Sequence, residues 1–401
     1  MLLRSFLLLP LVLLATACDE ILDGLGPDET TEETGGGPPT QFQTDAPQFH
    51  LPTFVDNLES SLNGSPGVAV VVIEGGNRAD VREIGNATYA PDPEGDLPMT
   101  VDTELPVASV SKFVGAIALL NALDEAGIDV DDPIVDHLPP GWRDLVHDDH
   151  TEAGAFTITF AGLLRMETGL AWPSAAMPTT NEMLATLRLP AIASLWGDYQ
   201  NGNFALIRVL IGELAFGLDE RDAGYNLDTA ESYEAYIADR IFDPLGISGV
   251  GHTKASGSVS RGYQNPLDLT FQDGNGFVGW DASDSWPNNP GSGGLYLSAM
   301  QLAEVLAYAR HDTEETILSA DRQAELWDRG LGLTEPRIGD HGLYHSKAGM
   351  RGADSNGRGY RSRIMIYPND VEVVVLANSE VPGLGSGSLL VSAFDDAWLA
   401  P

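Results

Sequence analysis

The segment Ser109-Val110-Ser111-Lys112 is the part of this 401-residue sequence best suited to chemistry. A run of apolar residues with helical spacing starts at Lys112, so Ser109 and Lys112 would lie on one face of the beginning of a helix. A serine hydroxyl becomes a nucleophile when a base takes its proton, and a lysine in a dry cleft has a pKa low enough to serve as that base. The pair therefore predicts a nucleophilic serine activated by a lysine.

Two other hydrolase motifs are missing from the sequence. No serine lies in the G-x-S-x-G pattern of the α/β-hydrolases, and no H-E-x-x-H pattern of a zinc protease is present. S-x-x-K alone is a modest signal, because the pattern is short enough to arise by chance. Its surroundings must therefore support it.

The composition is that of an acidic globular protein. The apolar fraction of 43% is sufficient for a packed core, and 59 acidic against 21 basic side chains give a net charge of −38. Phosphate binding depends on clustered lysine and arginine, so this charge argues against a nucleic-acid partner.

The N-terminus has the features of an export signal. An apolar run over residues 6–14 follows Arg4; it is too short to cross a bilayer as a helix, but it matches the apolar region of a secretory signal. Leu14-Ala15-Thr16-Ala17-Cys18 resembles a bacterial lipobox, whose cysteine receives lipid. We expect a signal peptide over residues 1–17 and a membrane anchor on Cys18, so that the protein is extracytoplasmic and lipid-anchored to the cell envelope. An ordinary cleaved signal with an incidental Cys18 is the alternative.

Cys18 is the only cysteine, so a lipidated protein would have no disulfide, no thiolate nucleophile and no cysteine-bound metal. After it the sequence is acidic, rich in Gly, Pro and Thr, and free of Lys and Arg, which predicts a disordered acidic tether over residues 18–49. No comparable linker follows, so residues 50–401 are expected to form one domain.

Within this domain, β-branched runs at 67–73 and 371–377 predict two buried strands. The spacing of apolar residues predicts helices over 112–126, 204–215, 233–242 and 299–310. Strands near both ends with helices between them favour a sheet built from both termini and a helical insertion.

The stretch Leu105-Pro106-Val107-Ala108-Ser109-Val110-Ser111-Lys112-Phe113 resembles the nucleophile segment of the serine β-lactamase and penicillin-binding protein superfamily. It is most similar to the class C β-lactamases and their esterase and D-aminopeptidase relatives. The resemblance continues, in the family's order, through residues 127–134, 158–164, 168–170, 199–201, 241–247 and 293–296. It implies an α/β (α+β) fold of the β-lactamase/transpeptidase type, with an antiparallel sheet flanked by helices and a mainly helical subdomain.

The resemblance also assigns roles to Tyr199-Gln200-Asn201, which is similar to the family's Y-x-N. Tyr199 would share the proton relay with Lys112, and the amide of Asn201 would bind the acyl side of the substrate. A tyrosine and an asparagine in a loop are by themselves uninformative, so these roles depend on their position after the serine motif.

The family's third motif, K-[ST]-G, is matched by Lys347-Ala348-Gly349. The resemblance implies that Lys347 supplies positive potential, that Gly349 lets the strand approach the ligand, and that the N–H groups of Met350 and Ser109 form an oxyanion hole. Two of the three lysines of the chain then lie at family positions. A solvated charge at a strand end is the alternative for Lys347. Ala348 lacks the family's hydroxyl, which puts efficient β-lactam hydrolysis in doubt.

Other candidate residues each have a plainer alternative. The arginines at 351, 358, 361 and 363 could bind a substrate carboxylate or pair with surface acids. His147 and His150 could ligate a metal or be solvated, and Trp172, Trp196, Trp280 and Trp286 could line a cleft or pack in the core.

Together these features predict a serine hydrolase that cleaves an ester or amide through an acyl-enzyme, without metal or organic cofactor. Its substrate would be a small molecule or peptide: a short ester, a D-amino-acid peptide or a β-lactam. Two alternatives stay open: a non-catalytic envelope lipoprotein that binds cell-wall fragments or a protein partner, and a penicillin-binding protein with tight acylation and slow release.

Overall fold

The computed structural model describes residues 47–152, 154–173, 177–252, 259–282, 290–352 and 354–399. The predicted signal peptide over residues 1–17, Cys18 and nearly all of the predicted tether lie outside the described residues. Among the residues described, no helix is long and apolar enough to cross a membrane.

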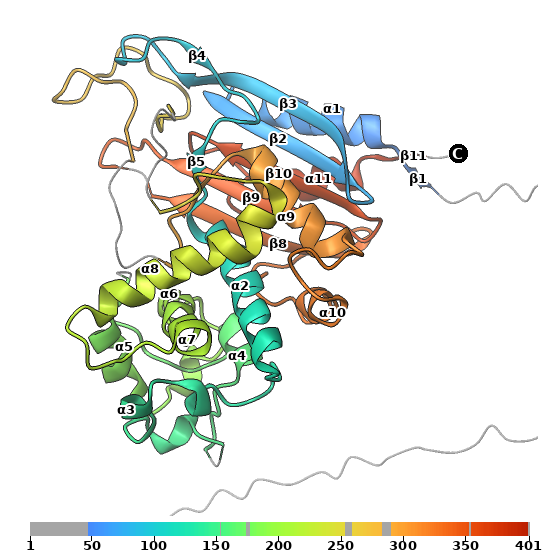
Figure 1. Ribbon diagram of the computed structural model, residues 1–401. Helices are drawn as coiled ribbons and strands as arrows, with labels where there is room; N and C mark the ends of the chain where they lie inside the picture. Colours follow the sequence, from blue (N-terminus) through green and yellow to red (C-terminus); the bar gives the residue numbers. More distant parts are fainter. Residues whose placement is uncertain are drawn as a thin grey trace, which may run out of the picture. The chain divides into compact units, whose positions relative to one another are not determined.

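A seven-stranded antiparallel sheet, in the order β4-β3-β2-β10-β9-β8-β7, lies at the centre of the described chain (Figure 1). Its strands are β2 (Gly67–Glu74), β3 (Asn77–Thr88), β4 (Leu97–Pro98), β7 (Arg337–Gly339), β8 (Gly342–Arg351), β9 (Tyr360–Ile366) and β10 (Val371–Ala377). The two strands expected from the sequence, β2 and β10, pair directly, with Val71 opposite Val374. The prediction of an antiparallel sheet built from both ends of the domain is confirmed.

Both faces of the central strands are buried, which explains their uninterrupted apolar sequences. In β2, alternate residues such as Val68 and Val70 face a core closed by α1 (Leu51–Leu62) and α11 (Ser388–Asp395). The intervening residues, including Val71, belong to a larger core shared with the remaining helices. The sheet is therefore the middle layer between two helical layers.

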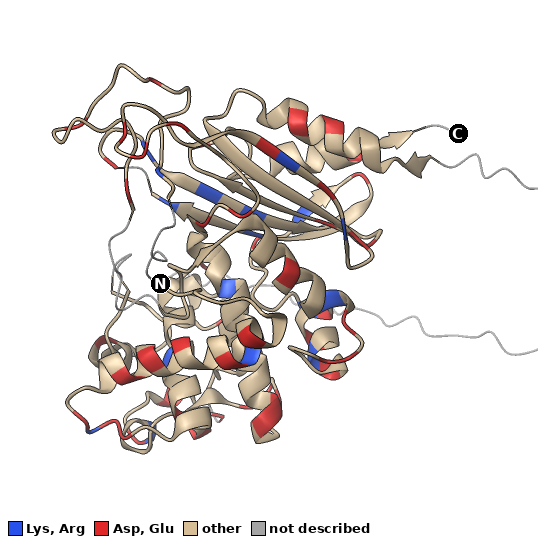
Figure 2. Cartoon of the chain, turned by 45° about the horizontal axis from the view of Figure 1, so that its top comes forward, with Lys and Arg blue, Asp and Glu red and all other residues tan. Residues whose placement is uncertain are grey.

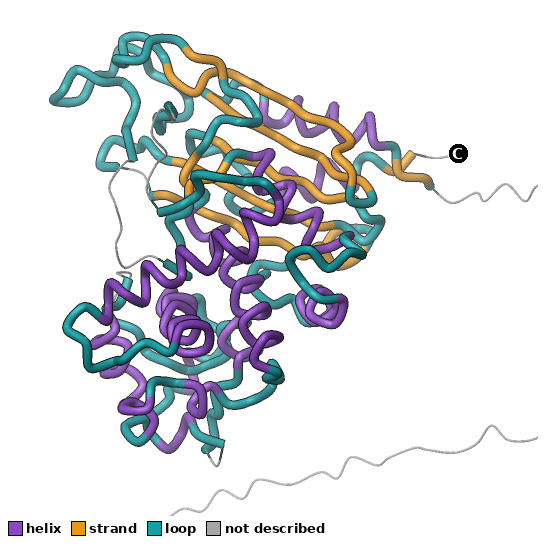
Figure 3. Tube along the Cα trace, in the orientation of Figure 1, coloured by secondary structure: helices purple, strands orange, loops and turns teal. Residues whose placement is uncertain are grey.

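The helices of the larger core form the mainly helical subdomain predicted from the sequence, and Figure 3 shows most of them gathered beyond one face of the sheet. They are α2 (Ser111–Ala126), α3 (Pro140–Arg143), α4 (Phe160–Leu164), α5 (Thr180–Leu187), α6 (Asn201–Ala205), α7 (Ile207–Ile211), α8 (Tyr225–Ile237), α9 (Ala299–His311) and α10 (Ala320–Asp328).

Helix α2 connects the sheet to this subdomain and is buried around its circumference. Its apolar residues are not restricted to one stripe, as expected for a helix enclosed on all sides. Gly127 ends it in a left-handed conformation, with φ of 66°. The helix predicted over 112–126 thus agrees with the structure to within one residue.

Two other predicted helices differ in extent. The stretch 204–215 is divided between α6, α7 and a following π-helical turn, Gly212–Phe216. Helix α8 begins at Tyr225, eight residues before the predicted start, because its first turns are polar and give little apolar periodicity.

Two short ladders complete the described strands. The first pairs β1 (Gln48–Phe49) with β11 (Trp398–Leu399), close to the ends of the described chain. The second pairs β5 (Leu105–Pro106) with β6 (Tyr296–Leu297). Because β5 runs directly into the segment that carries Ser109, this ladder joins the nucleophile segment to the chain around residue 295.

Charge is unevenly distributed over these elements. Figure 2 shows acidic residues spread along the helices, α8 among them, and several basic residues on the sheet. Strands β3, β8 and β9 carry Arg78, Arg82, Lys347, Arg361 and Arg363. The sheet is thus locally basic within a strongly acidic protein.

Candidate active site

Ser109 lies in a 3₁₀ turn, Ala108–Val110, between β5 and the start of α2. The N–H of Val107 donates to the carbonyl of Leu295 at 2.9 Å, and the hydroxyl of Ser362 donates to the carbonyl of Val107 at 2.6 Å. Ala108 has φ of 47°, a left-handed conformation that costs a non-glycine residue about 1–3 kcal/mol. Both hydrogen bonds act on Val107, so the backbone entering the strained turn is held in place immediately before Ala108 and Ser109.

Three side chains that the sequence singled out meet at this turn. The Nζ atom of Lys112 lies 3.2 Å from Ser109 Oγ, and the hydroxyl of Tyr199 donates to the same Oγ at 2.7 Å. Ser109 therefore has a basic group and a phenol within hydrogen-bonding distance at once, although Tyr199 is ninety residues away in the chain.

Lys112 is completely buried. Its Nζ donates to the amide oxygen of Asn201 at 2.8 Å and to the carbonyl of Ser292. Burial lowers the pKa of Lys112 well below its ordinary value, and the positive charge of Lys347 lowers it further, against an opposing effect of Glu335. The neutral amine, which can accept the proton of Ser109, is therefore favoured more than in an exposed lysine.

The pKa of Tyr199 is shifted in the opposite direction to that of Lys112. Burial raises the pKa of the Tyr199 phenol, and the negative charge of Glu335 adds to this. The side chain is 45% exposed as a whole, so the desolvated part is the hydroxyl end beside Ser109. The raised pKa favours a neutral phenol at Tyr199, which donates to Ser109, whereas the lowered pKa of Lys112 favours a neutral amine.

Lys347 lies on β8 and is also completely buried, so the alternative of a solvated strand-end charge is wrong. Its Nζ is 2.7 Å from Glu335 Oε1 and 4.8 Å from the centre of the Tyr199 ring. Burial lowers the pKa of Lys347, while Glu335 opposes this shift. The paired carboxylate favours a charged Lys347 next to a Lys112 that can be neutral.

Gly349, on β8, packs against the turn that carries Ser109. A Cβ atom at this position would collide with the carbonyl of Val107 and the hydroxyl of Ser362, and would lie 3.2 Å from the backbone nitrogen of Ser109. The expectation from the family resemblance was that glycine lets the strand approach a ligand. In the structure its first effect is to let β8 approach the turn that carries Ser109.

Sequence reasoning missed two residues of this constellation, Glu335 and Ser292. Glu335 lies in a loop before β7, where one acidic residue among 59 carries no signal. Ser292 contributes a backbone carbonyl to Lys112, which no side-chain pattern reveals. The neighbouring Gly293-Gly294 was the only available hint.

A cavity of about 150 Å³ opens at Ser109. Its lining includes Asn201 and Met350, both expected from the sequence, together with Ser292, His252 and Arg351. The site is thus a small, partly apolar pocket with a few polar groups around Ser109, the usual form of a small-molecule site.

The four clustered arginines have different roles: two pair with acids, one is buried among backbone carbonyls, and one lines the cavity. Arg358 pairs with Asp354 and Asp273, and Arg361 pairs with Glu380. Arg363 is buried and donates to Ser346 Oγ and to the carbonyls of residues 384 and 385. Arg351 alone of the four lines the cavity, with its guanidinium 5.5 Å from the centre of the Trp280 ring.

The weaker candidates have structural roles. His150 is buried with its Nε2 2.9 Å from the carbonyl of Leu189, and His147 lies 3.6 Å from Asp149. No group of three or more His, Cys, Asp or Glu residues suited to a metal occurs within the described ranges.

The tryptophans do not form one surface. Trp172 is buried and donates to Asn203, whereas Trp196 is exposed beside Phe156. Trp280 lies under Arg351, which lines the cavity. Trp286 lies outside the described residues.

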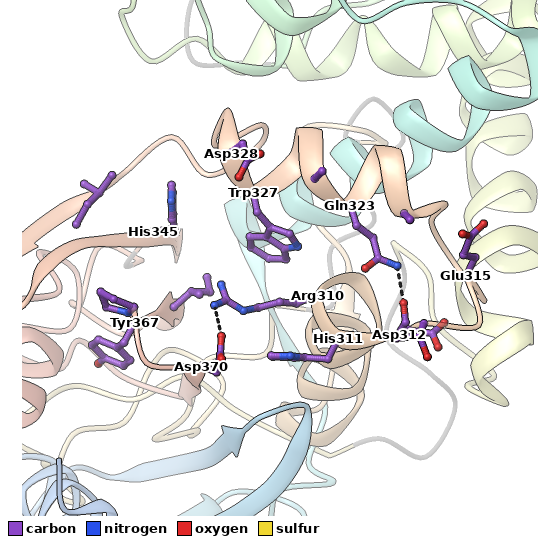
Figure 4. Close-up of a pocket in the computed structure, with 16 residues that line it drawn as sticks. Arg310, His311, Asp312, Glu315, Gln323, Trp327, Asp328, His345, Tyr367 and Asp370 are labelled. Atoms are coloured by element: carbon purple, nitrogen blue, oxygen red, sulfur yellow. Dashed lines mark hydrogen bonds and ion pairs between the residues drawn. The ribbon is translucent and has the colours of Figure 1, made fainter. Parts of the chain in front are cut away.

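A larger hollow, of about 680 Å³, lies elsewhere, between α9, α10 and the end of the sheet (Figure 4). Arg310 pairs there with Asp370 at 3.0 Å and with the buried Glu372 at 2.8 Å, and its guanidinium is 5.5 Å from the Trp327 ring. His311 contacts the same Glu372. Neither Ser109 nor Lys112 borders this hollow, which we call the Arg310 groove.

Comparison with known proteins places the chain in a family. The family model described as Beta-lactamase matches residues 55–388, which is most of the chain and includes every residue of the constellation around Ser109. The chain belongs to the beta-lactamase family. No curated protein matches it.

Solved structures share the fold of this beta-lactamase family member. The D-amino acid amidase from Ochrobactrum anthropi SV3 complexed with D-phenylalanine has a TM-score of 0.60 at 19% identity, over 86% of this chain and 99% of that chain. The class C beta-lactamase from Rhodobacter sphaeroides has a TM-score of 0.57 at 18% identity, over 85% and 98%. The octameric penicillin-binding protein homologue from Pyrococcus abyssi has a TM-score of 0.58 at 20% identity, over 86% and 75%.

Proposed function

We propose that this protein is a serine hydrolase that cleaves an ester or amide through a covalent acyl-enzyme on Ser109. The supporting observation is that one hydroxyl, Ser109 Oγ, lies 3.2 Å from the amine of the buried Lys112 and 2.7 Å from the phenol of Tyr199. A buried amine beside a serine on a strained turn is the arrangement that nucleophilic catalysis requires.

In the proposed first step, Lys112 Nζ takes the proton of Ser109 as Oγ forms a bond to the substrate carbonyl carbon. The negative charge that develops on the carbonyl oxygen would be held by the N–H groups of Ser109 and Met350. The charged Lys347, kept in place by Glu335, stabilises the same charge through the low-dielectric interior.

The tetrahedral intermediate then breaks its bond to the leaving group. The proton passes from Lys112 through the hydroxyl of Tyr199 to the leaving nitrogen or oxygen, which departs neutral. Water attacks the acyl-enzyme in a second round of the same steps, with the proton of water going to the base, and Ser109 is regenerated. No metal or organic cofactor takes part in this sequence.

The substrate is a small ester or amide. A cavity of about 150 Å³ admits a compact acyl group. Ala348 has no hydroxyl to hold a β-lactam carboxylate, so short esters and D-amino-acid derivatives are preferred candidates over β-lactams. The names of similar structures include a D-amino acid amidase and a hydrolase with promiscuous acyltransferase activity, which accords with this range.

We also propose that the protein is anchored to the cell envelope through lipid on Cys18, outside the cytoplasm. The lipobox-like sequence supports this proposal. Replacing Cys18 with serine is expected to move the protein from the membrane fraction to the soluble fraction in cell fractionation. An unchanged membrane fraction would contradict the anchor.

The test of the catalytic proposal is covalent labelling of the purified full-length protein with a fluorophosphonate, followed by intact-mass analysis and peptide mapping. One adduct, on Ser109, is expected, and it should be lost in Ser109→Ala and strongly reduced in Lys112→Ala. Ser111→Ala is the matched control, because Ser111 lies in the same segment and donates to no reacting group. Absence of the adduct in folded protein would favour the non-catalytic binding protein instead.

A further inference from the structure

A histidine that no motif points to lies in the wall of the Ser109 cavity. His252 follows α8 in a loop, is 5% exposed, and lines the cavity together with Ser109 and Asn201. The backbone of the preceding Gly251 pairs with Tyr296 in β6, where the N–H of Tyr296 donates to the Gly251 carbonyl at 3.0 Å. This bridge ties the histidine to the strand beside the nucleophile turn.

The ring of His252 is held by one of its two nitrogens. Nδ1 lies 2.6 Å from the carboxylate of Glu234 on α8. The hydrogen bond with His252 lowers the pKa of Glu234, so the carboxylate is ionised and can only accept. Nδ1 therefore carries the hydrogen that Glu234 accepts, which in the neutral tautomer leaves the lone pair on Nε2.

Nε2 itself is buried and has no hydrogen-bond partner among the described residues. A buried polar atom without a partner costs about 1–3 kcal/mol, so folded proteins rarely leave one unless it binds something. The free acceptor lies on a residue of the cavity wall, on the ring edge opposite Glu234.

We propose that His252, oriented by Glu234, is a specificity-determining residue whose Nε2 accepts a hydrogen bond from the substrate of Ser109. The substrate class is then an acyl ester or amide with an N–H or O–H donor close to the scissile carbonyl, such as an N-acylated amino acid, and not a plain fatty ester. This inference rests on the proposed serine hydrolase activity. It adds a preference for substrates with a hydrogen-bond donor, which the catalytic residues do not provide.

The test uses two esters that differ in one group: p-nitrophenyl N-acetylglycinate, with an N–H, and p-nitrophenyl levulinate, with a methylene in its place. The ratio of their kcat/KM values is measured for the wild-type protein and for His252→Phe. Dividing one ratio by the other cancels the intrinsic reactivities of the esters. One hydrogen bond predicts a wild-type ratio about five- to tenfold above that of the variant.

Glu234→Gln is the second variant, because Glu234 is partly exposed and its replacement leaves the core intact. It no longer fixes the hydrogen on Nδ1, so an intermediate ratio is expected. His341→Phe, which removes a histidine stacked on Trp398 away from the cavity, should keep the wild-type ratio. Thermal unfolding of each variant confirms that it is folded.

Equal ratios in wild type and His252→Phe would overturn the subsite, and so would a higher ratio in the variant. Acylation by neither ester, in protein that still forms the fluorophosphonate adduct on Ser109, would also overturn it. Loss of that adduct is a separate result, because it means that the proposed hydrolase itself has failed.

Discussion

The cavity at Ser109 and the Arg310 groove differ in what their charged groups do. The Arg310 groove is more than four times larger, about 680 against 150 Å³, but its main cation is neutralised by Asp370 and the buried Glu372. In the small cavity, Ser109 contacts a buried amine and a phenol whose pKa values are displaced by burial. Groups whose pKa values are displaced by burial therefore mark a candidate reactive site better than volume does.

Ser109→Ala should produce the largest loss of activity. It tests most directly whether the chemistry occurs in the Ser109 cavity and not in the Arg310 groove. Without the nucleophile, ester hydrolysis is expected to fall at least about a thousandfold, because no covalent intermediate forms. Steady-state hydrolysis of p-nitrophenyl esters measures this. Activity within about tenfold of wild type would show that the chemistry occurs elsewhere.

Lys112→Arg tests whether the buried amine acts as a base. A guanidinium keeps the positive charge but does not lose its proton in proteins, so a fall of about a hundredfold or more is expected. The fluorophosphonate adduct should form correspondingly slowly. Near-normal rates would mean that Lys112 supplies only charge.

Tyr199→Phe removes the hydroxyl that would relay the proton and keeps the aromatic ring beside Lys112 and Lys347. We expect kcat/KM to fall about ten- to a hundredfold, with a larger loss for amides than for p-nitrophenyl esters, because a nitrophenolate leaves without needing a proton. Parallel assays with both substrate types measure the difference. An equal loss for both would contradict the relay.

Glu335→Gln tests the ion pair that favours a charged Lys347 next to a neutral Lys112. We expect kcat/KM to fall about tenfold. In wild type, activity should rise with pH as Lys112 becomes neutral, and should fall at higher pH as Lys347 loses its proton. Glu335 raises the pKa of Lys347 against the effect of burial, so its removal should move the descending limb to lower pH. An unshifted pH profile, with activity lost, would indicate a structural effect only.

Arg310→Met in the groove should leave kcat/KM within about twofold of wild type, because Arg310 contacts no residue around Ser109. It removes partners of a buried carboxylate, so the free energy of unfolding should fall by about 1–3 kcal/mol. Denaturant unfolding and ester hydrolysis are measured on the same preparation. A large loss of activity with intact stability would make the groove part of the active site.

Much of the fold could be predicted because its signals are local. The runs over 67–73 and 371–377 are apolar on both faces because both faces of the sheet are covered. The helix predicted over 112–126 begins one residue earlier in the structure and ends at the predicted residue. The early turns of α8 were missed because packing against neighbouring helices, and not apolar periodicity, stabilises them.

The candidate site was partly predictable for a similar reason. Ser109 and Lys112 lie one helical turn apart, so chain geometry alone brings them together. Tyr199, Asn201 and Lys347 could be proposed only through family resemblance. Glu335 and His252 could not be proposed at all, because an isolated acid or histidine in a loop has no pattern.

The sequence by itself determined an acidic protein with a serine and a lysine one helical turn apart, two strands buried on both faces and a helix between them. Only the tertiary structure decided that Lys112 and Lys347 are both buried, that Glu335 forms an ion pair with Lys347, and that Nε2 of His252 has no hydrogen-bond partner among the described residues. The physical reason is that pKa values and hydrogen-bond satisfaction depend on burial and on neighbours distant in the chain.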